Sequence, residues 1–289
     1  MTGGAKSPLV PNIAVAACPE SVPFWELHNR RLLTVHCRLF ARWASLVCFL
    51  TGACLGGPSS AQPAADRTSE QPGAFDFYLM NFTIAPSFCA LSARYAEKQE
   101  CRSTTDASFQ DTPLTVHGLW PNRERVSVNL QPQYCEGPPL GRLSPPIRQS
   151  LVRYMPGVTD GLDRYEWRRH GTCSGLEAET YFTNVIHLAE WANDKIGGVL
   201  RDGGLLGRDV HVDDLLTAVA AKDPALAAAM IVNCRFSREE GTPSRAYIEE
   251  IRVVLSKNFQ PEPAERVGFG QNSGCPNRAG FLPSGFARH

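Results

Sequence analysis

The stretch LTVHGLWPN, Leu114–Asn122, has the alternation of a β-strand that is buried on one side. In a strand, Leu114 and Val116 point to one face, and Thr115 and His117 point to the other. The two aliphatic side chains can therefore lie in a hydrophobic core while His117 points into a cleft. This pattern favours a fold built on a sheet that carries a site on its second face.

The same stretch holds two further residues that suit a binding site. Gly118 has no side chain, so another backbone or a ligand can approach it closely. Trp120 offers a flat aromatic face on which a nucleobase can stack. The alternative is a buried structural histidine beside a core tryptophan, and this stretch taken alone does not choose between the two.

A second stretch, YEWRRHGTC (Tyr165–Cys173), gathers charged side chains. If it is helical, Glu166 and His170 are four residues apart and share one face, which Arg169 flanks. Gly171 can end such a helix in a left-handed conformation. A carboxylate stabilises a nearby imidazolium, and a guanidinium can hold an anion. The alternative is a solvated face of ion pairs, against which the tryptophan, glycine and cysteine of this stretch argue.

Two histidines, a glutamate and an arginine in one cleft, without a metal, suggest phosphoryl transfer by acid–base chemistry. One imidazole would remove a proton from the nucleophile and the other would protonate the leaving oxygen, while the charged groups stabilise the transition state. In RNA the ribose 2′-OH is a built-in nucleophile, so DNA should be inert. Because one imidazole must be charged and the other neutral, we expect an optimum at mildly acidic pH.

The rest of the chain mixes strand and helix patterns without regular alternation or internal repeats. The expected class is therefore α+β rather than a doubly wound α/β sheet. Six prolines within residues 121–146 indicate a long loop. Periodicity and β-branched content predict strands over residues 75–84, 114–118 and 246–256, and helices over residues 146–154, 177–196, 212–222 and 224–232.

Residues 1–61 read as an N-terminal extension that ends in a cleavable signal peptide. Arg38 and Arg42 precede an apolar run, and the segment closes on small residues at Ala61. The run is shorter than the roughly 20 residues that a transmembrane anchor needs. A lipoprotein site at Cys54 is a second alternative.

The signal lies far from Met1, so we expect the true translation start near Leu33 or Val35. Residues 62–74 should then form a flexible linker. Residues 75–289 should form one domain, and we expect it to be a monomer without stable membrane association.

Charge and cysteine content change when the signal is removed. The whole chain has 29 basic and 29 acidic residues, and loss of residues 1–61 leaves a formal charge of −3. Nothing in this balance indicates a protein that coats nucleic acid. Six cysteines remain, an even number in an exported chain, which predicts three disulfides with 15 possible pairings. No CxxC motif is present, so a zinc site is the weaker alternative.

Together, LTVHGLWPN and YEWRRHGTC resemble the two active-site segments of the ribonuclease T2 family, in the same order and with a similar separation. FDFYLMNFTIAPSFC resembles the family's first strand and IEEIRVVLS its late strand, so the resemblance spans about Phe75 to Cys275. It implies an α+β fold in which a central antiparallel sheet packs against several helices. It also implies a secreted or periplasmic endoribonuclease that cleaves single-stranded RNA through 2′,3′-cyclic phosphates to 3′-phosphates, with no metal or cofactor.

The resemblance assigns roles by motif position. His170 is expected to be the base and His117 the acid of the cyclising step, although the reverse remains open. Glu166 and Arg169 would stabilise the transition state. Trp120, Asn122 and Tyr165 would bind substrate. The implied disulfides are Cys89–Cys101, Cys135–Cys173 and Cys234–Cys275.

Four positions depart from the commoner family pattern. Arg169 stands where many members have Lys, which offers a point charge rather than a planar fork. Tyr165 stands where many have His, and Asn122 stands where an acid is common; we expect both to contact substrate. Val254 replaces a cysteine. The alternatives to an enzyme of this type are a non-catalytic RNA-binding or signalling relative and a metal-dependent phosphodiesterase.

Overall fold

The computed structural model describes residues 71–238, 243–268 and 270–286. The expected extension and signal peptide, and most of the expected linker, lie outside these residues. At the start of the described chain, the Gly73 N–H donates a hydrogen bond to the Cys173 carbonyl over 2.9 Å. Within the described ranges, none of the helices has the length and apolar character needed to span a bilayer.

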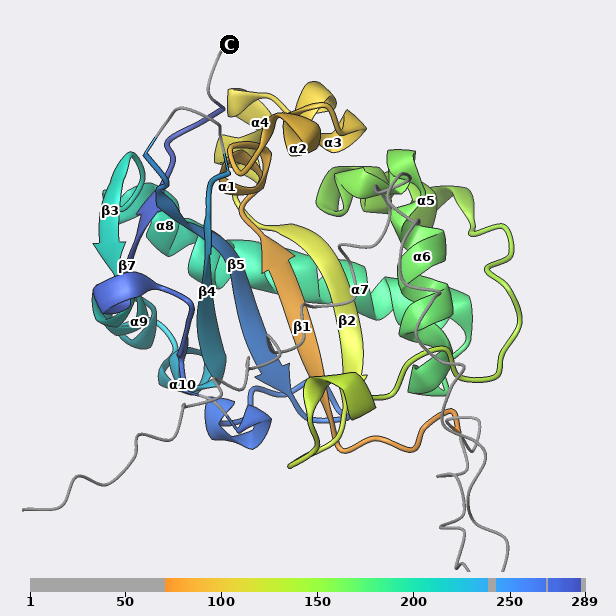
Figure 1. Ribbon diagram of the computed structural model, residues 1–289. Coiled ribbons are helices and arrows are strands. Elements are labelled where there is room, and N and C mark those ends of the chain that lie inside the picture. Colours follow the sequence, from red (N-terminus) through yellow and green to blue (C-terminus); the bar gives the residue numbers. More distant parts are fainter. Residues whose placement is uncertain (1–70, 239–242, 269, 287–289) are drawn as a thin grey trace, which may run out of the picture. The chain divides into compact units, whose positions relative to one another are not determined.

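In the described part of the chain, seven strands form one mixed and mostly antiparallel sheet (Figure 1). The central order is β2-β1-β5-β4-β6, while β7 pairs with β5 and β3. The class is α+β, as predicted. The strands are β1 (Phe77–Thr83), β2 (Thr115–Asn122), β3 (Arg208–His211), β4 (Met230–Phe236), β5 (Ala246–Leu255), β6 (Asn272–Ser273) and β7 (Ala279–Leu282).

Helices pack around this sheet, and the longest of them, α7, crosses behind it (Figure 1). Tyr181, Val185 and Leu188 recur on one side of α7 and are buried in the main core. The helices are α1 (Ala85–Cys89), α2 (Ala93–Ala96), α3 (Gln99–Ser103), α4 (Asp106–Asp111), α5 (Pro145–Tyr154), α6 (Leu162–Arg169), α7 (Ala178–Ala192), α8 (Gly198–Asp202), α9 (Val212–Ala220) and α10 (Pro224–Ala229).

The two faces of the sheet differ in character. Leu114 and Val116 lie in the main core on the α7 face, as their alternation predicted. The opposite face carries a smaller apolar cluster of Phe77, Leu79 and Val254, together with residues of other strands. Polar side chains occupy the rest of that second face, and they include His117.

Two β-bulges interrupt the ladder beside that polar region. Asn81 pairs with Gly118 and Phe82 with Val116, so His117 is the extra residue on β2. Asn233 pairs with Glu250 and Cys234 with Ile248, so Glu249 is the extra residue on β5. A bulge changes the direction of the side chains next to it and is common beside active sites. These two bulges direct an imidazole and neighbouring carboxylates to the same face.

The predicted helix over residues 224–232 is wrong in its last three residues. Asp223 caps α10 by accepting a hydrogen bond from the Leu226 N–H over 2.9 Å, and the helix ends at Ala229. From Met230 the chain becomes β4, where Met230 pairs with Val253 of β5. Pairing with a central strand overrides the helix propensity of the alanine run.

Strand β2 also runs to Asn122, beyond the predicted end near Gly118, because its partner β1 continues to Phe77. The three disulfides join the cysteine pairs that the family resemblance implies. The pair Cys135–Cys173 ties the proline-rich loop to the short 3₁₀ turn Gly171–Ser174 after α6.

Candidate active site

His117 projects from the β2 bulge and is held on two sides by carboxylates. Its Nδ1 lies 2.8 Å from Glu250 Oε1, and its Nε2 lies 3.9 Å from Glu166 Oε1. Its side chain remains 36% exposed. Burial alone would lower the pKa of His117, but the hydrogen bond and charge of Glu250, with the charges of Glu166 and Glu249, outweigh it and raise the pKa to about 9.

His170 lies at the end of α6 in a different environment. Its N–H donates to the Glu166 carbonyl over 2.8 Å, but its backbone has already left the helical conformation. The ring stacks on Trp120, with 4.9 Å between centroids and 24° between planes. Burial, reinforced by the positive charges of Arg169 and His117, lowers the pKa of His170 to about 3.

The sequence expectation for the end of α6 is wrong in one detail. The helix ends at Arg169 with His170 as its C-cap residue, and Gly171 begins the 3₁₀ turn rather than ending the helix with a positive φ. Gly171 is needed for a different reason, because a Cβ there would lie 2.4 Å from Cε3 of the Trp167 ring. The absent side chain lets the buried indole pack against the turn that fixes His170.

Glu166 connects the helix to the strand. Its Oε2 accepts a hydrogen bond from Trp120 Nε1 over 2.8 Å, and its side chain is 1% exposed. A Cβ on Gly118 would lie 2.1 Å from the same Oε2, so only glycine permits this approach. Burial raises the pKa of Glu166, opposed by the charge of His117 and the hydrogen bond from Trp120.

Two buried polar atoms next to Trp120 lack a hydrogen-bond partner among the described residues. They are Glu166 Oε1 and His170 Nδ1. A buried polar atom without a partner costs about 1–3 kcal/mol. Unpaired buried atoms call for an explanation, and a catalytic role is one that fits their place beside Trp120.

Arg169 lies at the edge of the histidine cluster, which consists of His117, Trp120, Glu166 and His170. Its Nε donates to Gln133 Oε1 over 2.9 Å, and its Nη1 donates to the Tyr165 hydroxyl. The guanidinium carbon lies 6.0 Å from the centroid of the Tyr134 ring. These contacts hold a half-buried cation close enough to His170 and Glu166 to affect the pKa of each.

The structure brings most of the predicted site residues together, with Trp120 at their centre. Trp120 contacts both imidazoles, since its ring also lies edge-on to His117 at 5.2 Å. Asn122 does not join this cluster. It is buried, and its Nδ2 donates to the Trp120 carbonyl over 2.9 Å. Its side-chain amide therefore braces the strand that carries Trp120.

Sequence reasoning missed the partner of His117. Glu250 is 5% exposed and its Oε2 accepts a fork of two hydrogen bonds from Arg252, from Nε over 3.0 Å and from Nη2 over 2.6 Å. The sequence did contain a hint of this partner, because two adjacent glutamates interrupt the apolar strand IEEIRVVLS. Adjacent acids in a central strand are unusual enough to mark a functional position.

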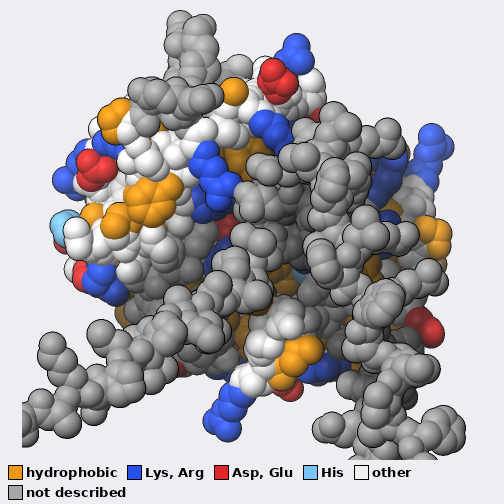
Figure 2. Space-filling model, in the orientation of Figure 1, with side chains coloured by type: hydrophobic (Ala, Val, Ile, Leu, Met, Phe, Trp, Pro, Cys, Tyr) orange, Lys and Arg blue, Asp and Glu red, His pale blue; other side chains and the backbone are white. Residues whose placement is uncertain are grey.

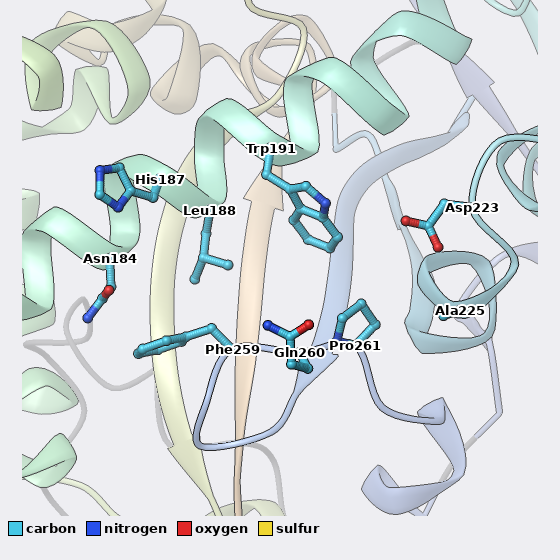
Figure 3. Close-up of a pocket in the computed structure, with 9 residues that line it drawn as sticks. All are labelled: Asn184, His187, Leu188, Trp191, Asp223, Ala225, Phe259, Gln260 and Pro261. Atoms are coloured by element: carbon cyan, nitrogen blue, oxygen red, sulfur yellow. The ribbon is translucent and has the colours of Figure 1, made fainter.

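A separate depression of about 510 Å³ lies between α7, α10 and the loop after β5 (Figure 3). His187 and Trp191 of α7 line it, together with Phe259 and Gln260 of the loop. None of the predicted site residues borders this depression. It is thus distinct from the histidine cluster.

Two surface properties bear on possible ligands. Among the described residues, no three or more His, Cys, Asp or Glu side chains form a group that could hold a metal ion. Where described side chains are visible in Figure 2, Lys and Arg groups lie in several separate places on that face.

Comparison with known proteins identifies the family. The profile of the ribonuclease T2 family matches residues 75–263. Ribonuclease I of Escherichia coli (strain K12) is 27% identical over 242 residues, which cover 73% of this chain and 87% of that protein. A ribonuclease of Aeromonas hydrophila is 30% identical over 131 residues, or 45% of this chain and 53% of that protein.

Solved structures share the fold. RNase NT, determined in complex with 5′-AMP, superposes with a TM-score of 0.55 at 20% identity over 72% of this chain and 98% of its own. The SF11-RNase associated with self-incompatibility in Nicotiana alata gives 0.51 at 16% identity, over 72% and 99% of the two chains. The family profile spans more than half of the sequence and carries both histidine segments, so the chain belongs to the ribonuclease T2 family.

Proposed function

We propose that this protein is an endoribonuclease that cleaves single-stranded RNA by transphosphorylation, without a metal or other cofactor. The observation that carries the proposal is the pair of histidines with opposite pKa shifts around one tryptophan. At neutral pH, His117 is protonated and His170 is neutral, as one acid and one base require. The family membership and the names of the relatives support the same chemistry.

In the first step, His170 accepts the proton of the ribose 2′-OH. The 2′-oxygen then forms a bond to phosphorus, and the bond from phosphorus to the 5′-oxygen breaks. His117 gives its proton to that leaving 5′-oxygen. The products are a 2′,3′-cyclic phosphate end and a free 5′-OH end, so atoms and charge balance.

In the second step, water opens the cyclic phosphate and the two histidines exchange roles by microscopic reversibility. His117, now neutral, removes a proton from water, and His170, now charged, protonates the leaving 2′-oxygen. A 3′-phosphate results. Throughout, Arg169 would stabilise the charge on the phosphoryl oxygens, and Glu166 would stabilise the imidazolium near it.

Substrate binding would use the groups around these histidines. Trp120 would hold a base through its exposed part, because His170 already stacks on its ring. Tyr165 would contact a phosphate next to Arg169. Its hydroxyl already accepts a hydrogen bond from the Arg169 guanidinium. The structure supports an indirect part for Asn122, since its amide braces the Trp120 backbone.

The environment of the enzyme follows from its cysteines. Three disulfides in one domain are typical of an oxidising compartment, which supports a secreted or periplasmic protein. We propose in addition that it acts as a monomer. The mass of the purified exported protein tests both points. A product that begins near residue 62 and sediments as a monomer is the expected result.

The direct test is digestion of RNA by the purified protein in EDTA. Cleavage with transient 2′,3′-cyclic ends is expected, while DNA and 2′-O-methyl RNA should remain intact. His187→Ala serves as a matched control because His187 lines the separate depression. Loss of activity in EDTA would indicate a metal enzyme, and RNA binding without cleavage would indicate the non-catalytic relative.

A further inference from the structure

The carboxylate of Glu250 holds the imidazole of His117 from the side opposite to Glu166. Its Oε1 lies 2.8 Å from Nδ1 of His117, which leaves Nε2 of the ring directed toward Glu166 Oε1. A carboxylate on one ring nitrogen fixes the proton there and sets which nitrogen is available for chemistry. Glu250 therefore determines both the orientation of the ring and the atom that it presents.

Glu250 is itself held firmly. The Arg252 side chain, 20% exposed, donates its two hydrogen bonds to Oε2 and leaves Oε1 for the histidine. The Glu250 backbone pairs with Thr83 of β1 on one side and with Asn233 of β4 on the other. The carboxylate thus extends from a central strand rather than from a loop.

The neighbouring Glu249 shows that the arrangement is specific. It is also buried, at 3% exposure, and comes from the same bulge, yet its Oε1 pairs with Arg235 over 3.0 Å and its Oε2 has no partner among the described residues. Burial and the charge of Glu250 raise the pKa of Glu249. Two adjacent buried carboxylates cost stability, which a purely structural role would not require.

We propose that Glu250, locked by Arg252, is a positioning residue that aligns and charges His117 for its role as the acid. This inference rests on the proposed function and adds to the two histidines a carboxylate that orients one of them. The same logic operates wherever an acid–base histidine is oriented by a buried carboxylate. Glu250 acts through His117 and does not touch substrate.

Charged groups reach His117 from several elements. Glu249, Glu250 and Arg252 come from β5, and Arg235 reaches the group from β4 through Glu249. The group from α6 consists of Glu166, Arg169 and His170. Glu100 of α3 is also close enough for its charge to interact with His117. Of these, Glu250 is the one that forms a hydrogen bond to the ring, and it has the largest charge effect on it.

The test compares Glu250→Gln with Glu249→Gln. Glutamine keeps the shape and a hydrogen-bond acceptor at either position but removes the charge. For Glu250→Gln, the alkaline limb of kcat/KM should move from about 9 toward the ordinary histidine value near 6.5, by about one pH unit or more. The variant should therefore lose about twofold in rate at pH 8 for a shift of one unit and about tenfold for a shift of two units, and almost nothing at pH 5. Glu249→Gln should shift the limb by a smaller amount.

A second readout does not depend on activity. The ring signals of His117, assigned by their absence in His117→Ala, are titrated by NMR in both variants. The pKa of His117 should fall by about a unit or more in Glu250→Gln, as the limb does. Glu250→Asp keeps the charge but shortens the side chain, so it should lower kcat and move the alkaline limb less than Glu250→Gln does.

An unchanged His117 titration in Glu250→Gln would overturn the inference. So would an equal loss of rate at all pH values, which indicates a structural role alone. If Glu250→Gln does not fold, a Glu250→Asp enzyme with an unchanged kcat and an unchanged alkaline limb would contradict the inference equally well. Failure of the proposed function has a different signature: the unsubstituted protein would not cleave RNA, whatever the titration shows.

Discussion

The two histidines of the site occupy opposite environments on either side of Trp120. His117 extends from a strand bulge between two carboxylates, whereas His170 ends a helix, next to a guanidinium and against an indole. The first is held in the charged form and the second in the neutral form. Under the proposed function, these different neighbours would give two identical side chains different tasks.

Removal of either imidazole should have the largest effect. We expect His117→Ala and His170→Ala each to lose about 10²–10⁴-fold in kcat on RNA, the range for a general acid or base. The double variant should be little worse than the poorer single one, because the two groups act as a unit. Steady-state rates with circular dichroism as the folding check measure this. Additive losses would argue that the histidines act independently.

The second-largest loss of activity is expected at Glu166, which connects α6 to β2 through Trp120. Glu166→Gln removes a buried charge between helix and strand, which should cost about 1.5–3 kcal/mol, or roughly tenfold to a hundredfold in kcat. Asp163→Asn is the matched control, since Asp163 is buried on the same helix and pairs with Arg148 instead. Equal losses in both variants would mean that Glu166 matters only for the stability of α6.

The contrast between the histidines also fixes the pH dependence. His170 must be neutral, so kcat/KM should fall about tenfold per unit below its pKa of about 3. His117 must be charged, so the rate should fall in the same way above about 9. The separation of the two values predicts a broad plateau rather than the mildly acidic peak that unperturbed histidines suggest. A sharp optimum near pH 6.5 would show that the environments do not separate them.

The smallest effect is expected at Arg169. Arg169→Lys keeps the charge beside His170 but loses the planar fork to Gln133 and Tyr165, so we expect a loss of about 0.5–1.4 kcal/mol, roughly twofold to tenfold in kcat. Arg168→Lys, on the exposed side of α6, is the control. A hundredfold loss in Arg169→Lys would indicate that the guanidinium itself forms a bidentate contact with the phosphate.

Local pattern predicted much of this arrangement from the sequence. Strand alternation placed Leu114 and Val116 in the core and His117 outside it. Helical spacing placed Glu166 one turn before His170, whose N–H donates to the Glu166 carbonyl although His170 has left the helix. These relations depend on neighbours in the chain, which a period of two or 3.6 residues describes.

Relations between distant segments were not predictable in the same way. The contact of Glu250 with His117 spans 133 residues and depends on two bulges, which sequence periodicity does not reveal. The conversion of the alanine run at α10 into β4 also depends on pairing with β5. The hydrogen bond from the Asn122 amide to the Trp120 carbonyl depends on side-chain packing. Tertiary context decided each of these outcomes.

The most direct test of His170 as the base and His117 as the acid uses a substrate with a good leaving group. A nucleoside 3′-(4-nitrophenyl phosphate) cyclises with loss of nitrophenolate, which needs no proton from an acid but still needs a base to remove the 2′-proton. Relative to RNA, this substrate should restore most of the activity of His117→Ala and little of that of His170→Ala. Rescue of His170→Ala instead would reverse the two roles and contradict the account.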